Sequence, residues 1–197
     1  MRSEVIGVTG LPCAGKTTLC NFLKRRLNAV YFSADSEIHR LFTLEWIKER
    51  IKRMFGDTAV VAGMVDRKFL ASVCFEDKKK ILLLEGLLHP YVIDASLKII
   101  YLCRRMNKHL VMDVPLLFES RMNKLCDKII FIRSSQKERI KRKSPLISID
   151  NFLKREKRFI NDNYKIDRAN CIIYNDKRID YIFKKVERYI DGRCYPN

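Results

Sequence analysis

The sequence predicts an α/β fold in which a five-stranded parallel sheet is flanked by helices. Two observations lead to this class. Short β-branched runs alternate with longer segments of helical periodicity, and a glycine-containing turn joins the first run to the first helix. The chain has 197 residues, 47% of them hydrophobic and 32% charged, so we expect one domain with a sizeable core. Its 7 glycines and 5 prolines are too few for a collagen-like chain or a turn-dense β-sandwich.

The expected elements follow in order along the chain. Val5–Thr9 is a β-branched run typical of a buried strand, and a helix after it is indicated by apolar residues at Leu19, Phe22, Leu23 and Leu27. Four more short apolar runs predict strands at 29–32, 110–113, 128–132 and 171–174. A closing helix has its apolar face at Ile179, Ile182, Phe183, Val186 and Ile190.

Two long segments interrupt this alternation. The first is mostly helical and runs over about 36–106, and the second is strongly basic and runs over about 135–168. Because each follows a strand of the predicted sheet, we expect both at the carboxyl ends of the strands, where such sheets bind ligands.

The chain carries a large positive charge. Lys and Arg number 40 against 23 Asp and Glu, a formal charge of +17, which implies an anionic partner. No apolar run approaches the roughly 20 residues of a membrane span, and the N-terminus lacks the apolar stretch of a signal peptide. We therefore expect a soluble, cytoplasmic protein with no membrane partner. The 7 cysteines are dispersed, which predicts reduced thiols and no zinc site.

The turn after the first strand carries the most specific motif of the chain. Residues Gly10 to Thr17 match G-x-x-x-x-G-K-T, between a predicted strand and a predicted helix as the phosphate-binding loop requires. Backbone N–H groups of such a loop cradle a β-phosphate, Lys16 reaches the β- and γ-phosphates, and the Thr17 hydroxyl ligates Mg²⁺. A chance match is disfavoured because the chain is poor in glycine.

Asp35 lies just beyond the second predicted strand. A carboxylate there could accept the proton of a hydroxyl that attacks a γ-phosphate. Alternatively, Asp35 could cap a helix that begins at Ser36, since Asp is a preferred capping residue. From this position alone, the cap is the better interpretation.

Further motifs follow in a fixed order and shift that balance. They are Ala34-Asp35, Gly63-Met64-Val65-Asp66-Arg67, Leu84-Glu85-Gly86-Leu87-Leu88-His89-Pro90, Asp113-Val114-Pro115-Leu116-Leu117-Phe118-Glu119, Gln136-x-x-Arg139-x-x-Arg142 and Ala169-Asn170-Cys171-Ile172-Ile173-Tyr174-Asn175. Together with the phosphate loop, this series closely resembles the dephospho-coenzyme A kinase family over about 5–175. The loop is shared with many families, but the Asp-Arg, His-Pro and Pro-Leu-Leu-x-Glu motifs in this order are much more specific.

The resemblance implies transfer of the ATP γ-phosphoryl group to the ribose 3′-hydroxyl of dephospho-CoA, the last step of coenzyme A synthesis. It implies a P-loop kinase core (1–35, 107–134 and 169–197), a helical CoA-binding insertion (about 36–106) and a basic lid (about 135–168) within one domain. ATP and Mg²⁺ would be the cofactors, and ATP and dephospho-CoA the small-molecule partners.

The resemblance also assigns residues. Asp35 and Lys16 would be catalytic, and Asp35, Arg67 and His89 would contact the acceptor. Thr17 would bind the metal, with Asp113 acting through water. The ATP-binding set would be Gly10, Leu11, Pro12, Cys13, Ala14, Gly15, Lys16, Thr17, Thr18, Arg142 and Asn175, of which Arg142 belongs to the lid and Asn175 lies near the adenine.

Several of these residues have simpler interpretations. His89 could cap a helix start before Pro90, Arg67 could pair with Asp66 or Glu85, and Asp113 could belong to an ordinary strand-end turn. Glu119 could engage a basic partner or nothing. Among the lid arginines, Arg142 is favoured by its spacing from Gln136, whereas Arg139, Arg155 and Arg158 could form a solvated face.

The chain also departs from the family pattern. Leu11, Pro12 and Cys13 replace glycines and a serine of the usual loop, and Pro12 removes one N–H donor. A glutamine expected near Phe159 has no equivalent, which makes the lid contacts the weakest part of the comparison. A thiol at Cys13, near Lys16 and a helix N-terminus, suggests sensitivity to oxidation and alkylation that ATP should block.

Two other functions compete with this one. A nucleoside monophosphate kinase would share the architecture, but its acceptor is a phosphate and needs arginines more than a base such as Asp35. A basic RNA-binding P-loop protein would explain the charge, but the chain lacks an RNA-binding signature, so a nucleic-acid partner is not expected.

Overall fold

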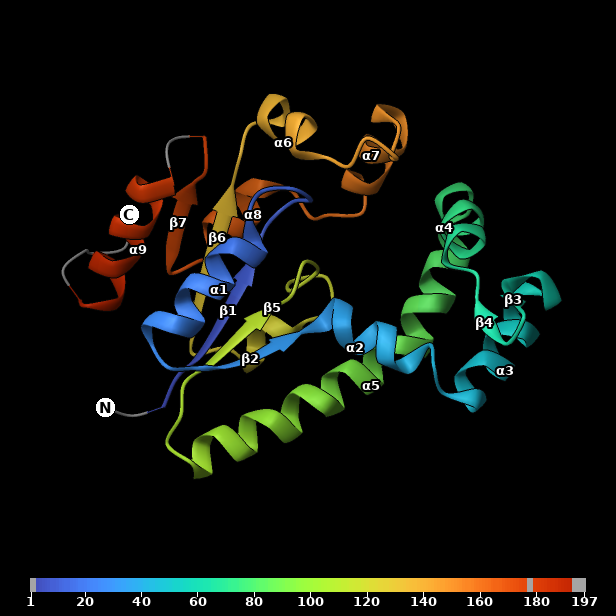
Figure 1. Cartoon of the computed structure of the whole chain (residues 1–197), viewed down its shortest axis with the longest axis horizontal. Helices are drawn as coiled ribbons and strands as arrows, with labels where there is room; N and C mark the ends of the chain where they lie inside the picture. The colour runs from blue at the N-terminus through green and yellow to red at the C-terminus, as the bar shows by residue number, and fades with distance from the viewer. Residues whose placement is uncertain (1–2, 177–178, 193–197) are drawn as a thin grey trace. The chain divides into compact units, whose positions relative to one another are not determined.

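The computed structural model describes residues 3–176 and 179–192 (Figure 1). Five strands form one sheet in the order β2-β5-β1-β6-β7, and every neighbouring pair is parallel. They are β1 (Val5–Thr9), β2 (Val30–Ser33), β5 (Leu110–Asp113), β6 (Lys128–Arg133) and β7 (Cys171–Tyr174). The predicted five-stranded parallel sheet is confirmed, and the strand bounds differ from the expected ones by at most one residue.

The sheet forms because its strands are apolar on both faces. All residues of β1 and β5 are buried, as expected where helices cover a parallel sheet. Helices α1 (Lys16–Arg26) and α9 (Ile179–Ile190) share one core with the central strands. The rings of Phe22 and Phe183 stack between these two helices with centroids 4.1 Å apart. The apolar periodicity expected of the first and last helices is therefore what holds them to the sheet.

The strand order places a switch point beside β1. The chain leaves β1 for β2 on one side and later returns through β5 to β6 on the other side. At such a point two successive connections diverge and leave a crevice at the carboxyl ends of the strands. The motif 10–17 lies at this end of β1.

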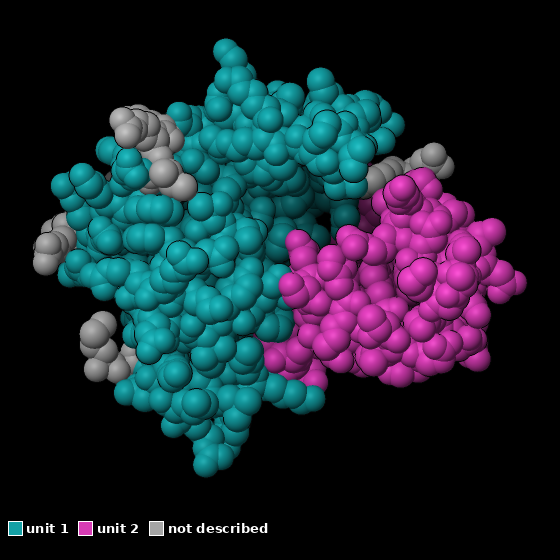
Figure 2. Space-filling model, in the orientation of Figure 1, with its two compact units in different colours: residues 1–33, 97–197 teal, residues 34–96 magenta. Residues whose placement is uncertain are grey.

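The chain forms two compact units, and Figure 2 colours them separately. Unit 1 comprises residues 1–33 and 97–197 and holds the five-stranded sheet. Unit 2 comprises residues 34–96. The long helix α5 (Lys78–Arg105) continues from one unit into the other.

Unit 2 is mostly helical, as the periodicity predicted. It contains α2 (Ala34–Leu41), α3 (Glu45–Phe55), a 3-10 turn η1 (Asp57–Ala59), α4 (Arg67–Glu76) and the first part of α5. A small antiparallel pair, β3 (Val60–Val61) and β4 (Met64–Val65), was not expected from the sequence. Ala62 and Gly63 turn between these strands with φ of 49° and 74°, the geometry of a two-residue hairpin turn.

The basic segment before β7 is built from short capped helices. These are α6 (Gln136–Arg142), α7 (Ile149–Glu156) and α8 (Asp162–Ile166), and Ser135, Ser148 and Asn161 cap them. A second 3-10 turn, η2 (Met122–Leu125), precedes β6. Within the described parts of the chain, no helix is both long and apolar enough to span a membrane. Six cysteines have free thiols there, and Cys194 lies outside the described residues.

Candidate active site

The loop between β1 and α1 has the backbone that phosphate binding requires. Gly10 and Gly15 adopt φ of 157° and 101°. A Cβ atom at Gly10 would collide with the carbonyl of Ile132, and one at Gly15 would collide with the side-chain amide of Asn175. Glycine is therefore needed at both ends of the loop.

Cys13 is the strained residue of this loop. It adopts φ of 60°, a left-handed conformation that a non-glycine residue takes at a cost of roughly 1–2 kcal/mol. The Ala14 N–H donates to the Leu11 carbonyl at 3.2 Å, which closes the turn over Pro12 and Cys13. The loop thus keeps the expected curvature although a cysteine stands where the family pattern has glycine.

Lys16 begins α1 and folds back over the loop. Its Nζ donates to the carbonyls of Gly10 at 2.9 Å and Leu11 at 3.1 Å. The first turn of α1 contains no acidic residue, so the positive end of the helix dipole adds to the lysine charge. A positive side chain above a turn at a helix N-terminus is suited to bind a phosphate group.

A carboxylate at the end of β5 reaches the same helix. Asp113 is 6% exposed, and its Oδ2 accepts from the Thr17 hydroxyl at 3.1 Å and from the Tyr31 hydroxyl at 3.2 Å. Burial, followed by the charge of Asp113, raises the pKa of Tyr31, so this phenol stays protonated and serves as a donor. Tyr31 was not expected at the site, because in the sequence it is only one residue of the apolar run that predicts β2.

Thr17 and Asp113 fit a magnesium ion. A hydroxyl and a carboxylate in contact are the hard oxygen ligands that Mg²⁺ takes, and Mg²⁺ usually completes its shell with water and substrate phosphates. Among the described residues, no group of three or more His, Cys, Asp or Glu side chains is placed to hold a metal by itself. The Thr17 hydroxyl and the Asp113 carboxylate are therefore the candidate magnesium ligands beside the loop.

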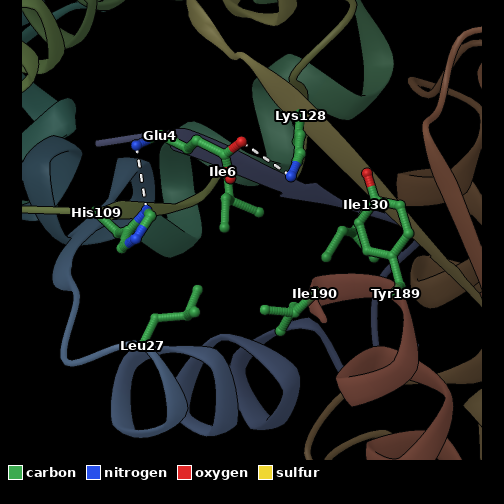
Figure 3. Close-up of a pocket in the computed structure, with 8 residues that line it drawn as sticks. All are labelled: Glu4, Ile6, Leu27, His109, Lys128, Ile130, Tyr189 and Ile190. Carbon is green, nitrogen blue, oxygen red and sulfur yellow. Dashed lines mark hydrogen bonds and ion pairs between the residues drawn. The ribbon is translucent and has the colours of Figure 1, made fainter. Parts of the chain in front are cut away.

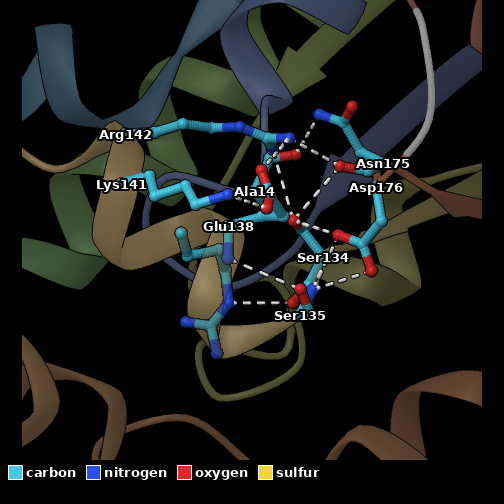
Figure 4. Close-up of polar contacts among 9 residues, drawn as sticks. Ala14, Ser134, Ser135, Glu138, Lys141, Arg142, Asn175 and Asp176 are labelled. Atoms are coloured by element: carbon cyan, nitrogen blue, oxygen red, sulfur yellow. Dashed lines mark hydrogen bonds and ion pairs between the residues drawn. The ribbon is translucent and has the colours of Figure 1, made fainter.

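The structure brings Arg142 and the last motif to the phosphate loop (Figure 4). The Asn175 side-chain amide donates to the Ala14 carbonyl at 2.7 Å. Its backbone carbonyl accepts from Arg142 Nη2 at 2.8 Å. Residues 14, 142 and 175, which are far apart in the sequence, thus form one wall beside α1.

Arg139, unlike Arg142, is buried. Its side chain is 5% exposed, donates through Nε to the Ser134 carbonyl at 2.9 Å and pairs with Glu156. This arginine fastens α6 to α7 rather than presenting its charge to solvent.

Glu119 has a basic partner, which decides between the two interpretations left open by the sequence. Its Oε1 accepts from the Ile160 N–H at 2.7 Å and lies 3.4 Å from Nζ of Lys165, whose side chain is fully buried. The Phe159 ring lies 4.8 Å from the same Nζ. Phe159, near which the family pattern has a glutamine, therefore packs on the buried Lys165.

Unit 2 carries the three residues expected at the acceptor. Asp35 is exposed in the first turn of α2, two residues after β2, and Arg67 is exposed as the first residue of α4. Asp66 caps α4 by accepting from the N–H groups of Lys68 at 2.9 Å and Phe69 at 3.0 Å. His89 is half-buried in the middle of α5.

Two of the alternative interpretations are wrong. Asp35 does not cap a helix that starts at Ser36, because α2 begins at Ala34 and Asp35 lies inside it. His89 does not cap a helix start, because α5 begins at Lys78 and continues through Pro90. With these two capping roles excluded, contact with the acceptor remains the prediction for Asp35 and His89.

Comparison with known proteins identifies the family. A family model described as dephospho-CoA kinase matches residues 4–180. The chain belongs to the dephospho-CoA kinase family. The relatives of this kinase include dephospho-CoA kinases from Fusobacterium nucleatum, 32% identical over 97% of this chain and 99% of that protein, and Bartonella quintana, 31% identical over 96% and 97%.

Solved structures agree with the kinase fold. A crystal structure of a Thermus thermophilus protein matches 98% of both chains with a TM-score of 0.81 and 25% identity. The dephospho-CoA kinase from Campylobacter jejuni matches 96% of this chain and 98% of its own with a TM-score of 0.67. At 24% and 17% identity, that structure and the Aquifex aeolicus shikimate kinase (TM-score 0.55) show the fold alone.

A separate cavity of about 200 Å³ lies in unit 1 of this kinase, at the amino ends of the strands (Figure 3). Ile6, Leu27, Ile130 and Ile190 are among its lining residues. At its rim, Lys128 pairs with Glu4 at 2.9 Å, and His109 Nδ1 accepts from the Glu4 N–H at 3.2 Å. Because the phosphate loop is at the carboxyl end of β1, this cavity is not part of the nucleotide site.

Proposed function

We propose that this kinase transfers the γ-phosphoryl group of MgATP to the ribose 3′-hydroxyl of dephospho-CoA, giving coenzyme A and ADP. The observation that carries the proposal is the phosphate loop of unit 1, with Lys16 folded over it and the Thr17–Asp113 pair beside it, in a chain that matches the family from residue 4 to 180.

On the donor side, the loop N–H groups and Lys16 bind the β- and γ-phosphates. Thr17, and Asp113 through water, would hold a magnesium ion, which would neutralise charge on the phosphate oxygens. Arg142 contacts a phosphate oxygen of ATP. The loop N–H groups and Lys16 stabilise the charge that builds up on the transferred group, whereas Arg142 contributes to the binding of ATP.

On the acceptor side, Asp35 accepts the proton of the attacking hydroxyl and orients it in line. Its placement supports this role because Ser33 pairs in register with Asp113 at the carboxyl ends of β2 and β5, and Asp35 follows two residues later. Arg67 and His89 contact the acceptor. A hydroxyl acceptor requires such a base, whereas the phosphate acceptor of a nucleoside monophosphate kinase does not.

These roles divide the chain into three functional parts. Residues 1–35, 107–134 and 169–197 form the core, about 36–106 the CoA-binding insertion and about 135–168 the lid. The unit boundary at 33/34 lies within about three residues of the expected start of the insertion, whereas the boundary at 96/97 lies about ten residues before its expected end.

The test is ADP release from MgATP with dephospho-CoA, AMP, CMP and adenosine compared side by side. Turnover with dephospho-CoA alone is expected, and Asp35→Asn should lower kcat by about 10²-fold or more, as for loss of a general base. Asp57→Asn, which neutralises an exposed aspartate of the same unit, is the matched control and should retain activity.

Other outcomes would refute parts of the proposal. Turnover with a monophosphate would keep the fold and exclude the acceptor. Full activity of Asp35→Asn would exclude it as the base. Absence of turnover together with salt-dependent retention of RNA during purification would favour the nucleic-acid-binding alternative.

A further inference from the structure

Asp176 is a charged residue beside the nucleotide site that the sequence motifs do not include. It directly follows Asn175, and its carboxylate accepts from the Ser134 hydroxyl at 2.7 Å and from the Ser135 N–H at 2.9 Å (Figure 4). Ser134 and Ser135 form the turn after β6, whereas Asp176 lies in the turn after β7. The carboxylate therefore joins the two turns that follow the last two strands.

The Ser134 hydroxyl connects Asp176 to Arg142. Ser134 is 5% exposed, and its Oγ lies 2.7 Å from Asp176, 3.2 Å from Arg142 Nη1 and 3.2 Å from the Asn175 carbonyl. A hydroxyl has one proton, and the ionised carboxylate at the shortest distance is its strongest acceptor. The lone pairs of Oγ are then left to accept from Arg142.

The charge state of Asp176 agrees with this arrangement. Desolvation of the carboxylate acts to raise its pKa, but hydrogen bonds from Ser134 and Ser135 and the charge of Arg142 outweigh it and lower the pKa below the ordinary value. At neutral pH the carboxylate is thus ionised and can only accept hydrogen bonds.

Arg142 is consequently held by two oxygens whose positions depend on Asp176. One is the Ser134 hydroxyl, which the carboxylate orients, and the other is the Asn175 carbonyl at 2.8 Å, one residue before Asp176. Asn175 also holds the Ala14 carbonyl of the phosphate loop through its side-chain amide. A shift of the Asp176 turn would thus displace both the lid arginine and a support of the loop.

We propose that Asp176 is a positioning residue of the donor-nucleotide site, which fixes Ser134 and Asn175 so that Arg142 is poised to bind ATP. This inference rests on the proposed role of Arg142 as a phosphate contact. Asp176 touches none of the reacting atoms, so its effect falls on ATP affinity and leaves the chemical step and the acceptor unaffected.

The experiment combines steady-state kinetics with binding of a fluorescent ATP analogue in the presence of Mg²⁺. Asp176→Asn keeps the size of the side chain but removes its charge, and it should raise both the KM for ATP and the Kd of the analogue about 10-fold. The kcat and the KM for dephospho-CoA should stay within about twofold. Asp150→Asn, which neutralises an exposed aspartate that pairs with Lys154 at 2.9 Å, is the matched control and should change neither constant.

A double-variant comparison separates positioning from a general effect on the fold. In an Arg142→Met background, adding Asp176→Asn should change ATP affinity less than about twofold, because residues that act through one contact are not additive. An equal loss in both backgrounds, a fall in kcat with unchanged ATP affinity, or tighter ATP binding would each overturn the inference.

Two further measurements keep the test decisive. If Asp176→Asn does not fold, Ser134→Ala removes the same link and should weaken ATP binding about threefold; unchanged binding would overturn the inference. Wild-type protein that fails to bind the ATP analogue would overturn the proposed function and the inference with it. Wild-type binding that Asp176→Asn and Ser134→Ala leave intact would overturn the inference alone.

Discussion

The buried Lys165–Glu119 pair makes a large and specific prediction for stability. Lys165 is fully buried, and its Nζ lies 3.4 Å from the Glu119 carboxylate and 4.8 Å from the centre of the Phe159 ring. Replacing Lys165 by Met keeps most of the volume but leaves the carboxylate of Glu119 without its positive partner. Breaking one side of a buried ion pair costs about 3–5 kcal/mol.

A double variant and an exposed control variant test this explanation. In the Lys165→Met/Glu119→Gln double variant the uncompensated charge is gone, so most of the lost stability should return, to within about 1 kcal/mol of wild type. For a chain of this size, about 3 kcal/mol corresponds to a fall in Tm of roughly 6–12 °C. Lys154→Met removes an exposed lysine that pairs with Asp150, and it should change stability by less than about 1 kcal/mol.

The same pair predicts a pH dependence of stability. Burial lowers the pKa of Lys165, and Glu119 only partly opposes this. Between the folded and the unfolded pKa the unfolded chain then binds more protons, so this lysine makes stability rise with pH through that window up to about 10.5. Below the pKa of Lys165 in the folded state, the full cost of burying this charged side chain is present. Urea unfolding at a series of alkaline pH values should show this rise in wild type and a shallower one in Lys165→Met. A stability for Lys165→Met within about 0.5 kcal/mol of wild type would refute the reasoning for the single variant.

The remaining predictions concern the phosphate loop and the metal. Asp113→Asn should raise the Mg²⁺ concentration for half-maximal activity by about 10-fold or more, because a charged metal partner is lost, and a Mg²⁺ titration checks this. An unchanged Mg²⁺ requirement would contradict it. Gly15→Ala should weaken ATP binding more than about 10-fold, since its Cβ collides with Asn175 at a left-handed φ, and Gly86→Ala, at an open position, is its control. Cys13 should be alkylated by iodoacetamide and protected by MgATP, as peptide mass spectrometry would show; equal labelling with and without nucleotide would exclude a thiol inside the bound phosphate loop.

The sheet and its loop could be predicted because their signals are local. Val5–Thr9 and Leu110–Asp113 are continuous apolar runs that only a sheet covered on both faces buries, and the motif after the first run has few alternatives. The His89-Pro90 pair misled the analysis of helix bounds, because proline usually marks a boundary and here lies inside a 28-residue helix.

Contacts between distant residues could not be predicted in this way. Glu119 and Lys165 are 46 positions apart, and Ser134 and Asp176 are 42 positions apart. Nothing in either local pattern indicates the partner, because a buried lysine in a basic segment has the same sequence signature as a solvated one. The register of β6 and β7, which pairs Arg133 with Tyr174, is what brings the turns of Ser134 and Asp176 together.

Asn175 links the phosphate loop to Arg142. Its amide occupies the space that a side chain at residue 15 would need, and it donates to the carbonyl of the loop residue before that glycine. Its own carbonyl binds Arg142, and its N–H donates to the Arg133 carbonyl at 2.7 Å. Its backbone N–H thus binds β6, its carbonyl binds α6, and its side chain binds the phosphate loop. Glycine at 15 therefore leaves room for the Asn175 amide, and that amide holds the loop against the wall that Arg142 contacts.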